Sequence, residues 1–313
     1  MHPPTLNWLL WLAIVVVNSA PLAAVTIYAP AMLPNALALT TVLIIFALLG
    51  IELLLPYRRD WAFRSDHEIW RDIGHTLMYS QAITLSRILF LFVLAGVIEK
   101  AGLFGIVNLW PSSFPTWLQV LLVVVVGDAL EYSYHRLAHS SPLLWRLHAL
   151  HHTPERLHVL KGGRHHFLYA FGRGVVVWTP LLFLGAPAQI IFWQYVAEVI
   201  TGLVGHANID FRCPRLLHRF IVTPEFHRLH HSSAPQHGNS NYGVVLPLWD
   251  ILFRSHSDPN VFAAQTLGIQ DDPIPRRFLS ELLSPFIYKR LVAAKKNAIQ
   301  PFAQAEVKRA APF

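Results

Sequence analysis

Residues 117–139 read WLQVLLVVVVGDALEYSYHRLAH, an apolar run that leads directly into two histidines, His135 and His139. The apolar part, Trp117 to Tyr134, is close to the roughly 20 residues that a helix needs to cross the hydrocarbon core of a membrane. On a helix, residues three or four positions apart lie on one face. The stretch therefore predicts a membrane-spanning helix whose last turns present two imidazoles on the same side.

Two further histidine motifs follow along the chain. They have closely related spacing and read His148-Ala-Leu-His151-His152 and His227-Arg-Leu-His230-His231. Three helical faces of this kind, converging on one point, supply eight imidazoles. A single metal ion with four to six ligands cannot use eight histidines, so the pattern indicates two metal ions.

The composition of the 313-residue chain is typical of a membrane protein. Hydrophobic residues make up 54% and charged residues only 14%, against roughly 25% charged in an ordinary soluble domain. Fourteen of the 18 histidines lie between His135 and His237. The single cysteine, Cys213, excludes a disulfide framework, a four-thiolate zinc site and an iron–sulfur cluster. The net charge of +7 is scattered among apolar residues, which disfavours nucleic acid as a partner and favours an anionic membrane surface.

Four apolar segments have the length of membrane-spanning helices: Leu6–Tyr28, Leu33–Leu55, Leu77–Ile98 and Trp117–Tyr134. No basic residue precedes the first, so we interpret it as a retained membrane segment rather than a signal peptide. A further apolar region, 175–204, is interrupted by Pro180, Gly185 and Pro187, which predicts a pair of short re-entrant helices. The loop after the second segment holds four arginines and is expected on the cytoplasmic side. An even number of crossings then places the histidine motifs and both termini there.

The sequence divides into three expected parts. Residues 1–116 hold transmembrane helices and loops, residues 117–256 carry the histidine motifs, and residues 257–313 hold a C-terminal helix and tail. Arg277–Val292 has apolar residues at helical spacing and is expected to lie on the bilayer, followed by a mobile tail, Lys295–Phe313. The predicted fold is an all-α integral membrane protein with about four transmembrane helices and a re-entrant helix pair, capped by a cytoplasmic helical domain.

The residue types limit the chemistry of the metal centre. Imidazole binds zinc, copper, iron and nickel alike. The HExxH motif of zinc proteases is absent, because Arg228 and Leu229 separate His227 from His230. Haem would need histidines inside the bilayer, and a carboxylate-bridged di-iron site would need two ExxH motifs. A pair of irons held by histidine alone fits best, since O2 activation needs a redox metal with open positions.

A second class of function stays open: a zinc-dependent membrane lipid hydrolase, or a metal-binding protein without oxygen chemistry. A metal carrier would place polar residues in several membrane crossings. The first three apolar segments hold almost none, which disfavours that version. A zinc hydrolase would keep its activity without O2, so iron content and a requirement for O2 separate the two classes.

Five stretches combine histidines with characteristic neighbours: Asp128-Ala-Leu-Glu-Tyr-Ser-Tyr-His-Arg-Leu-Ala-His139, Trp145-Arg-Leu-His-Ala-Leu-His-His152, Gly205-His-Ala-Asn208, Thr223-Pro-Glu-Phe-His-Arg-Leu-His-His231, and Asn241-Tyr-Gly243 leading to Leu248-Trp-Asp-Ile-Leu-Phe253. Together they resemble the fatty acid hydroxylase superfamily, also called the sterol desaturase family, over about residues 120–256. The resemblance implies a catalytic domain over residues 117–256. It also implies a membrane-embedded, non-haem di-iron enzyme that uses O2 and two electrons to hydroxylate, or sometimes desaturate, a lipid.

The resemblance also implies roles for single residues. By matching positions, the metal ligands are His135, His139, His148, His151, His152, His206, His227, His230 and His231. His166 sits where members often have a further histidine, although Phe167 replaces the usual proline. Glu155 matches a glutamate of the alkylglycerol mono-oxygenase branch and is a catalytic candidate, with a solvated surface acid as the alternative. Asp128 and Glu131, which precede His135 on the same helix, are candidates for orienting ligand imidazoles, with helix capping or pairing with arginine as the alternative.

The implied cofactors are two Fe²⁺ ions, with O2 as co-substrate. The sequence shows no fused flavin-binding or haem-binding domain, so electrons are expected from a separate donor protein. The histidine motifs begin where the fourth apolar segment ends. The expected substrate is therefore an amphiphile that reaches the site from the bilayer.

Overall fold

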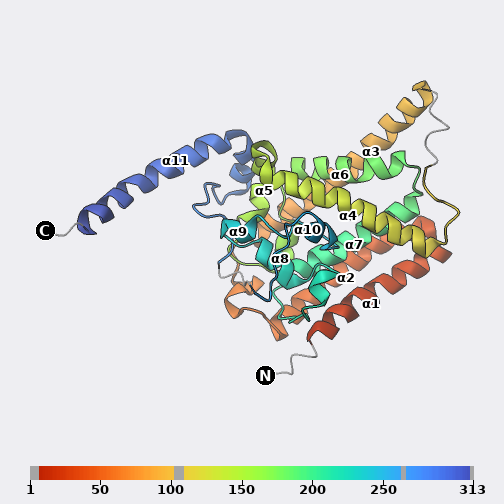
Figure 1. Cartoon of the computed structure of the whole chain (residues 1–313), viewed down its shortest axis with the longest axis horizontal. Coiled ribbons are helices and arrows are strands. Elements are labelled where there is room, and N and C mark those ends of the chain that lie inside the picture. Colours follow the sequence, from red (N-terminus) through yellow and green to blue (C-terminus); the bar gives the residue numbers. More distant parts are fainter. Residues whose placement is uncertain (1–6, 102–108, 262–265, 311–313) are drawn as a thin grey trace.

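The computed structural model describes residues 7–101, 109–261 and 266–310, and these fold into helices and connecting loops (Figure 1). The α-helices are α1 (Asn7–Tyr28), α2 (Leu33–Leu54), α3 (Ile69–Ala101), α4 (Thr116–Ser140), α5 (Pro142–His152), α6 (Phe167–Phe183), α7 (Ala188–His206), α8 (Pro224–His230), α9 (Pro235–Gly238), α10 (Leu248–Leu252) and α11 (Phe278–Ala310). No strand forms within the described ranges. The all-α prediction is confirmed.

Among the described residues, four helices are long and apolar enough to cross a membrane. They are Trp8–Tyr28 in α1, Asn35–Leu54 in α2, α4 and α7. Helices α1, α2 and α4 expose large apolar side chains, such as Val17 at 66% and Phe46 and Trp117 at 69% each, whereas α7 is more enclosed by its neighbours. Lipid tolerates such a surface, whereas water penalises it. The prediction of an integral membrane protein with about four spanning helices is confirmed, but the set of helices differs. Within the described residues α7 is one of the four, and α3, which contains the predicted segment Leu77–Ile98, is not.

The region predicted as a re-entrant pair forms α6 and α7. Pro180 lies inside α6, while Gly185, with φ 84°, and Pro187 lie in the turn between the two helices. Because this turn ends before Ala188, α7 keeps 19 residues and is long enough to cross a membrane, longer than the short helix expected there. The predicted segment Leu77–Ile98 falls within the single, longer helix α3, and Leu6 lies outside the described residues.

One end of the bundle collects the segments that carry the histidine motifs. Helices α2, α4 and α7 end there, and α3 and α6 begin there (Figure 1). The short helices α5, α8, α9 and α10 and their loops lie toward this end (Figure 1). Helix α4 packs on α5, α6 and α7, and α3 packs on α6. The last turns of α4 and α7 are thereby brought next to α5 and α8.

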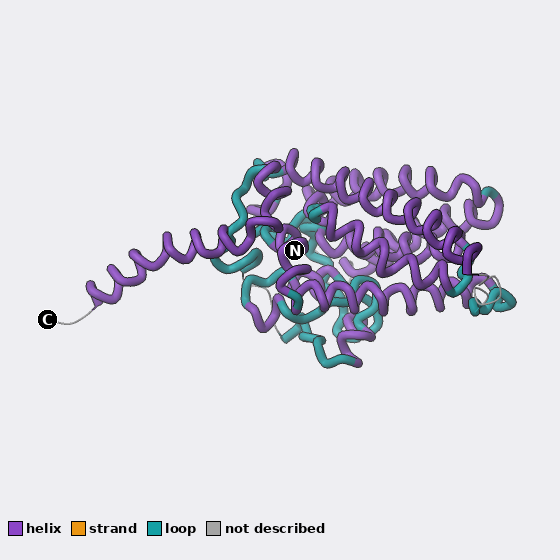
Figure 2. Tube along the Cα trace, turned by 90° about the horizontal axis from the view of Figure 1, so that it is seen from above, coloured by secondary structure: helices purple, strands orange, loops and turns teal. Residues whose placement is uncertain are grey.

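Helix α11 extends away from the bundle (Figure 1 and Figure 2). It contains almost all of the predicted amphipathic segment Arg277–Val292 and continues to Ala310, through most of the expected tail. Residues 311–313 of that tail lie outside the described residues. Leu279, Leu283 and Phe286 are exposed near its start, as a helix lying on a bilayer surface would require.

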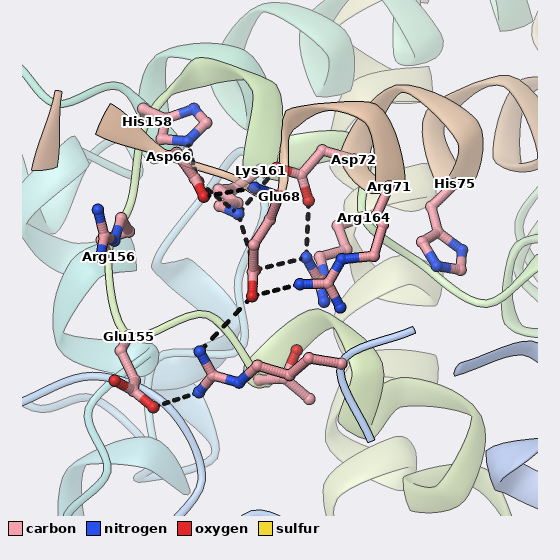
Figure 3. Close-up of polar contacts among 12 residues, drawn as sticks. Asp66, Glu68, Arg71, Asp72, His75, Glu155, Arg156, His158, Lys161 and Arg164 are labelled. Atoms are coloured by element: carbon pink, nitrogen blue, oxygen red, sulfur yellow. Dashed lines mark hydrogen bonds and ion pairs between the residues drawn. The ribbon is translucent and has the colours of Figure 1, made fainter. Parts of the chain in front are cut away.

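A buried charge cluster joins the start of α3, the connector between α5 and α6, and the start of α11 (Figure 3). Its centre is the ammonium of Lys161. The Nζ atom lies 2.7 Å from Asp66 Oδ2, 2.8 Å from Asp72 Oδ2 and 3.1 Å from Glu68 Oε2. Together with His158, the two aspartates have the residue types of a metal site. The lysine ammonium already supplies the positive charge that these acids need.

Arg164 extends this charge cluster to α11. Its guanidinium donates to Asp72 Oδ1 at 2.8 Å and to Glu281 Oε1 at 2.6 Å. Arg71 and His75 of α3 contact the same Glu281 carboxylate, at 2.5 Å and 2.9 Å. Arg164 and Glu281 are both fully buried. The cluster therefore fixes the first turn of α11 against α3, beside the histidine end of the bundle.

Candidate metal centre

Five histidines from three helices form the first group. His135 and His139 come from α4, His148 and His152 from α5, and His230 from α8. The Nε2 atoms lie 3.1 Å apart between His135 and His148, and 3.2 Å apart between His139 and His152. All five candidate ligand atoms lie within 4.8 Å of one another. Four of the rings are buried, and His139 is partly exposed.

Four buried histidines form the second group. His151 comes from α5, His206 from the last turn of α7, His227 from α8, and His231 directly follows α8. The Nε2 atom of His206 lies 3.3 Å from that of His151 and 3.0 Å from that of His227. The two groups adjoin, because the rings of His231 and His152 stack with their centroids 4.6 Å apart.

Each HxxHH motif contributes to both groups. In the motif of α5, the first and last histidines, His148 and His152, belong to the first group, and the middle one belongs to the second. In the motif of α8 the assignment is reversed: His227 and His231 belong to the second group and His230 to the first. The structure thus brings together all nine histidines that the sequence analysis named besides His166, and it divides them between two centres.

The hydrogen bonds of the rings indicate that these groups hold cations. The Nδ1 atoms of His135, His206 and His230 lie 2.7, 2.6 and 2.7 Å from backbone carbonyl oxygens. A carbonyl only accepts, so each Nδ1 carries the proton and each Nε2 presents a lone pair to its group. Buried lone pairs that converge on one point repel each other unless a cation lies between them.

The distances between the Nε2 atoms also fit a cation bound between them. Ligands about 2.1 Å from a shared metal ion, at angles of 90° to 109°, lie roughly 3.0–3.4 Å apart. The Nε2 separations of 3.0 to 3.3 Å fall in that range.

The histidines of the two HxxHH motifs are neutral. Burial first, and then the neighbouring imidazoles, lower the pKa of each of them. This applies to His148, His151, His152, His227, His230 and His231. They are neutral at pH 7, which is the form that binds metal.

Two carboxylates position the loop that orients the ligands. Asp128 of α4 accepts the backbone N–H groups of Val245 and Leu246, at 2.8 and 3.0 Å. Asp250 of α10 accepts those of Tyr242 and Gly243. The carbonyls of Tyr242 and Ser240, in the same loop, contact His135 and His230. Asp128 therefore contacts no imidazole directly; it holds the loop whose carbonyls do so.

Glu155, the other predicted catalytic residue, lies outside both groups. Its side chain is 66% exposed and forms an ion pair with Arg276, which lies in the segment leading to α11. The structure does not bring it to the metal centre. Its environment is that of the surface acid that the sequence analysis kept as the alternative.

His166 also lies outside both groups. Its Nδ1 accepts the backbone N–H of Leu168, which caps the start of α6, and its Nε2 donates to the carbonyl of Leu282 in α11. With both nitrogens engaged, no lone pair is left for a metal ion. Its neighbour His165 lies at the metal centre instead, stacked on His151 with ring centroids 3.8 Å apart. Two histidines are adjacent in the sequence here, and the position at which α6 begins decides which of them faces the histidine groups.

Replacing His166 by alanine is expected to leave the metal content unchanged and to lower the stability by about 1 kcal/mol, the typical value of a helix N-cap. Metal analysis and a thermal unfolding curve of the purified variant measure the two quantities. Loss of a metal ion from this variant, with the fold intact, would show that His166 is a ligand.

A cavity of about 230 Å³ opens beside both histidine groups. One wall consists of histidines from both groups, and His165 and Tyr169 adjoin them. The other wall consists of Thr41 and Ile45 of α2, Thr76, Tyr79 and Ser80 of α3, and Tyr195, Val199 and Leu203 of α7. Helix α2 packs on α1 and α7, and α3 packs on α6, so the cavity reaches between two long helices that do not pack closely on each other.

The described residues thus form an all-helical membrane fold with two adjoining, all-histidine groups that could hold metal ions, beside a cavity. The chain belongs to the fatty acid hydroxylase superfamily. The family model for fatty acid hydroxylases matches residues 120–255, the part that carries the histidine motifs. The resemblance inferred from the motifs is thereby confirmed.

Relatives from bacteria, animals and fungi are similar to this chain. Ornithine lipid hydroxylase OlsE of Rhizobium tropici is 36% identical over 258 residues, which cover 82% of this chain and 76% of that protein. An alkylglycerol monooxygenase of Caenorhabditis elegans is 26% identical over 162 residues, 50% of this chain and 31% of that protein. Fatty acid hydroxylase vlmA of a Lecanicillium species is 31% identical over 160 residues, 45% of this chain and 43% of that protein. No solved structure gives a significant match.

Proposed function

We propose that this chain is a membrane-bound, non-haem di-iron hydroxylase that converts a C–H bond of a bilayer lipid into C–OH. The observation that carries the proposal is the pair of adjoining, all-imidazole groups beside a cavity that reaches between membrane helices. Membership of the fatty acid hydroxylase superfamily supports it. So does the first group, whose five histidines exceed the four ligands of a structural zinc ion.

The proposed reaction consumes one O2, two electrons and two protons. One oxygen atom enters the lipid hydroxyl group and the other leaves as water. Iron, when bound by the two groups, would supply the redox chemistry with O2. A separate donor protein supplies the electrons in this proposal, and the partly exposed His139 is the ligand through which they would most easily reach the first group.

The protein's own residues prepare the site. Loop carbonyls fix the rings of His135 and His230, and the carbonyl of Gly202 fixes that of His206. Burial of the remaining ligands excludes bulk water, which would otherwise compete for the open metal positions and quench reactive species. Val199 and Leu203 give the cavity an apolar wall against which a lipid can pack.

The proposed substrate is a lipid with a polar head group, as the similarity to an ornithine lipid hydroxylase suggests. The cavity of about 230 Å³ is smaller than the roughly 300–1,000 Å³ of pockets that enclose a drug-sized ligand. It therefore holds part of a lipid, while the acyl chains remain in the bilayer between α2 and α3. We place the site on the cytoplasmic side, because the loop before α3 is rich in arginine.

The experiment that tests this function uses protein purified without oxygen and a soluble reductant. Metal analysis is expected to give about two irons per chain, and O2 is expected to be consumed only when a lipid extract is added. Lipids from cells with and without the gene, compared by mass spectrometry, would then show a species heavier by one oxygen atom. Zinc in place of iron, with lipid turnover in the absence of O2, would establish the hydrolase alternative.

A further inference from the structure

The cavity contains a charged network one to two helical turns deeper in the bundle than the metal groups. Arg173 of α6 is its centre. Its Nε donates to Glu131 Oε1 at 2.5 Å, and an Nη nitrogen lies 2.7 Å from Glu198 Oε2. The other Nη nitrogen donates to the hydroxyl of Tyr79. All four of these side chains line the cavity.

One hydrogen-bond acceptor of the network has no partner within the described residues. Each nitrogen of the Arg173 guanidinium already has a partner, and both oxygens of Glu198 are engaged, one with Arg173 and one with Gln194. The Oε2 atom of Glu131 is buried and has no hydrogen-bond partner within the described residues. Glu131 itself is only 3% exposed. A buried carboxylate oxygen without a partner is costly, so its position in a cavity wall points to a ligand that donates hydrogen bonds.

The charges of the network indicate the sign of the charge that this ligand carries. Two carboxylates face one guanidinium in the cavity wall. Farther out, Arg87 stacks on Trp178 and Tyr195, and no ion pair of its guanidinium is found among the described residues. With both acids ionised, the three directly paired groups Glu131, Glu198 and Arg173 carry one excess negative charge, which a cationic hydrogen-bond donor balances at low dielectric constant.

The distance to the metal centre follows from the helix. Glu131 precedes His135 by four residues on α4, so the two side chains lie on one face, about 6 Å apart along the axis. Both line the same cavity. A group held by Glu131 therefore has its nearest carbon atoms next to the first histidine group.

We propose that Glu131, with Glu198, binds an ammonium group of the lipid head group and thereby selects lipids with a free, protonated amine and positions the carbons next to that amine at the metal centre. This inference rests on the proposed function for its setting, and it goes further by assigning the residue that recognises the head group. The lipid enters between α2 and α3 with its head group foremost.

Binding of two matched lipids tests the inference without turnover. The probes are an ornithine lipid, whose free side-chain amine is cationic at pH 7, and the same lipid with that amine acetylated. Each is titrated, without O2, into the full-length, metal-loaded protein in phosphatidylcholine nanodiscs. Charge-assisted hydrogen bonds justify an expected preference of about tenfold to a hundredfold for the free amine. Equal binding of the two lipids by the unaltered protein would overturn the proposal.

Two substitutions at Glu131 test whether this residue causes the preference for the free amine. Glu131→Gln keeps the shape of the side chain and removes its charge, and is expected to reduce the preference to below about threefold while metal content stays the same. Glu131→Asp keeps the charge and is expected to retain most of the preference. Asp60→Asn, in an exposed ion pair with Arg58, is the matched control and should bind both lipids as the unaltered protein does. An unchanged preference in a folded Glu131→Gln variant would contradict the assignment.

The same samples separate this inference from the proposed function. Admitting O2 and reductant reports whether a hydroxylated lipid forms at all. Hydroxylation of both lipids, with equal binding, would refute the proposed amine site and support the hydroxylase function. Selective binding of the amine lipid without any O2-dependent product would refute the hydroxylase function and support the amine site.

Discussion

Replacing His227 by alanine is expected to remove one of two bound irons and to lower lipid hydroxylation by more than about a hundredfold, the upper range for disturbing residues that merely support metal ligands. His227 belongs to the group of four, and its Nε2 lies within 3.1 Å of two other ligand nitrogens. Three neutral imidazoles would remain, and because Fe²⁺ binds such ligands less tightly than Zn²⁺ or Cu²⁺ does, the loss of one ligand is expected to release it. Iron per chain, measured after gel filtration, gives the result.

Two further variants calibrate this effect. His139→Ala leaves four histidines in the first group and removes its only partly exposed member, so it should retain more iron than His227→Ala. His67→Ala removes an exposed histidine outside both groups and should retain all of it. A folded His227→Ala protein with two irons and full activity would refute the ligand assignment.

Replacing Glu281 by glutamine is expected to destabilise the protein by about 3–5 kcal/mol, the usual cost of breaking a buried ion pair from one side. The glutamine would have the same shape, but the buried Arg164 and its neighbour Arg71 would lose a charged partner, and His75 would face an amide in place of a carboxylate. Thermal unfolding in detergent measures the change. Asp60→Asn, in an exposed ion pair that solvent screens, should change the stability far less. A similar loss of stability in both variants would show that the buried cluster contributes no more to stability than an exposed ion pair does.

The pH dependence of stability provides an independent check on this cluster. Burial alone would raise the pKa of Glu68, but Arg164, Lys161 and Arg71 outweigh it and lower the pKa to about 2. The pKa values of Asp66 and Glu281 are lowered as well, again because facing cations and histidines outweigh burial. Acids with lowered pKa values stabilise the fold above their ordinary pKa, near 4, and lose that contribution as the pH falls through the lowered value. Stability should therefore drop below about pH 4, and less steeply in Glu281→Gln.

The nine clustered histidines could be predicted because the signal for most of them is local. Spacings of three and four residues place imidazoles on one helical face, and the recurrence of the spacing reveals that several faces belong to one site. His206 has no such partner nearby in the sequence, and only the family resemblance supplied it. The division of each HxxHH motif between two groups could not be predicted, because helical spacing gives the direction of a side chain but not what faces it.

Other features have no local signal at all. Lys161 and Glu281 are separated from their partners by long stretches of chain and read individually as surface charges. His165 and His166 are adjacent, and the position of the first turn of α6 decides which one reaches the metal centre. Glu131 could be placed on the histidine face of α4, but its pairing with Arg173 depends on the packing of α6 against α4. The sequence thus specifies the chemistry of the site more fully than the contacts around it.

The most direct test of the di-iron hydroxylase assignment is the origin of the oxygen atom in the product. Protein loaded with iron, supplied with reductant and an ornithine lipid under ¹⁸O2 in ordinary water, is predicted to give a hydroxylated lipid that carries one ¹⁸O atom. Product that carries oxygen from water, or that forms equally well without O2, would contradict the account.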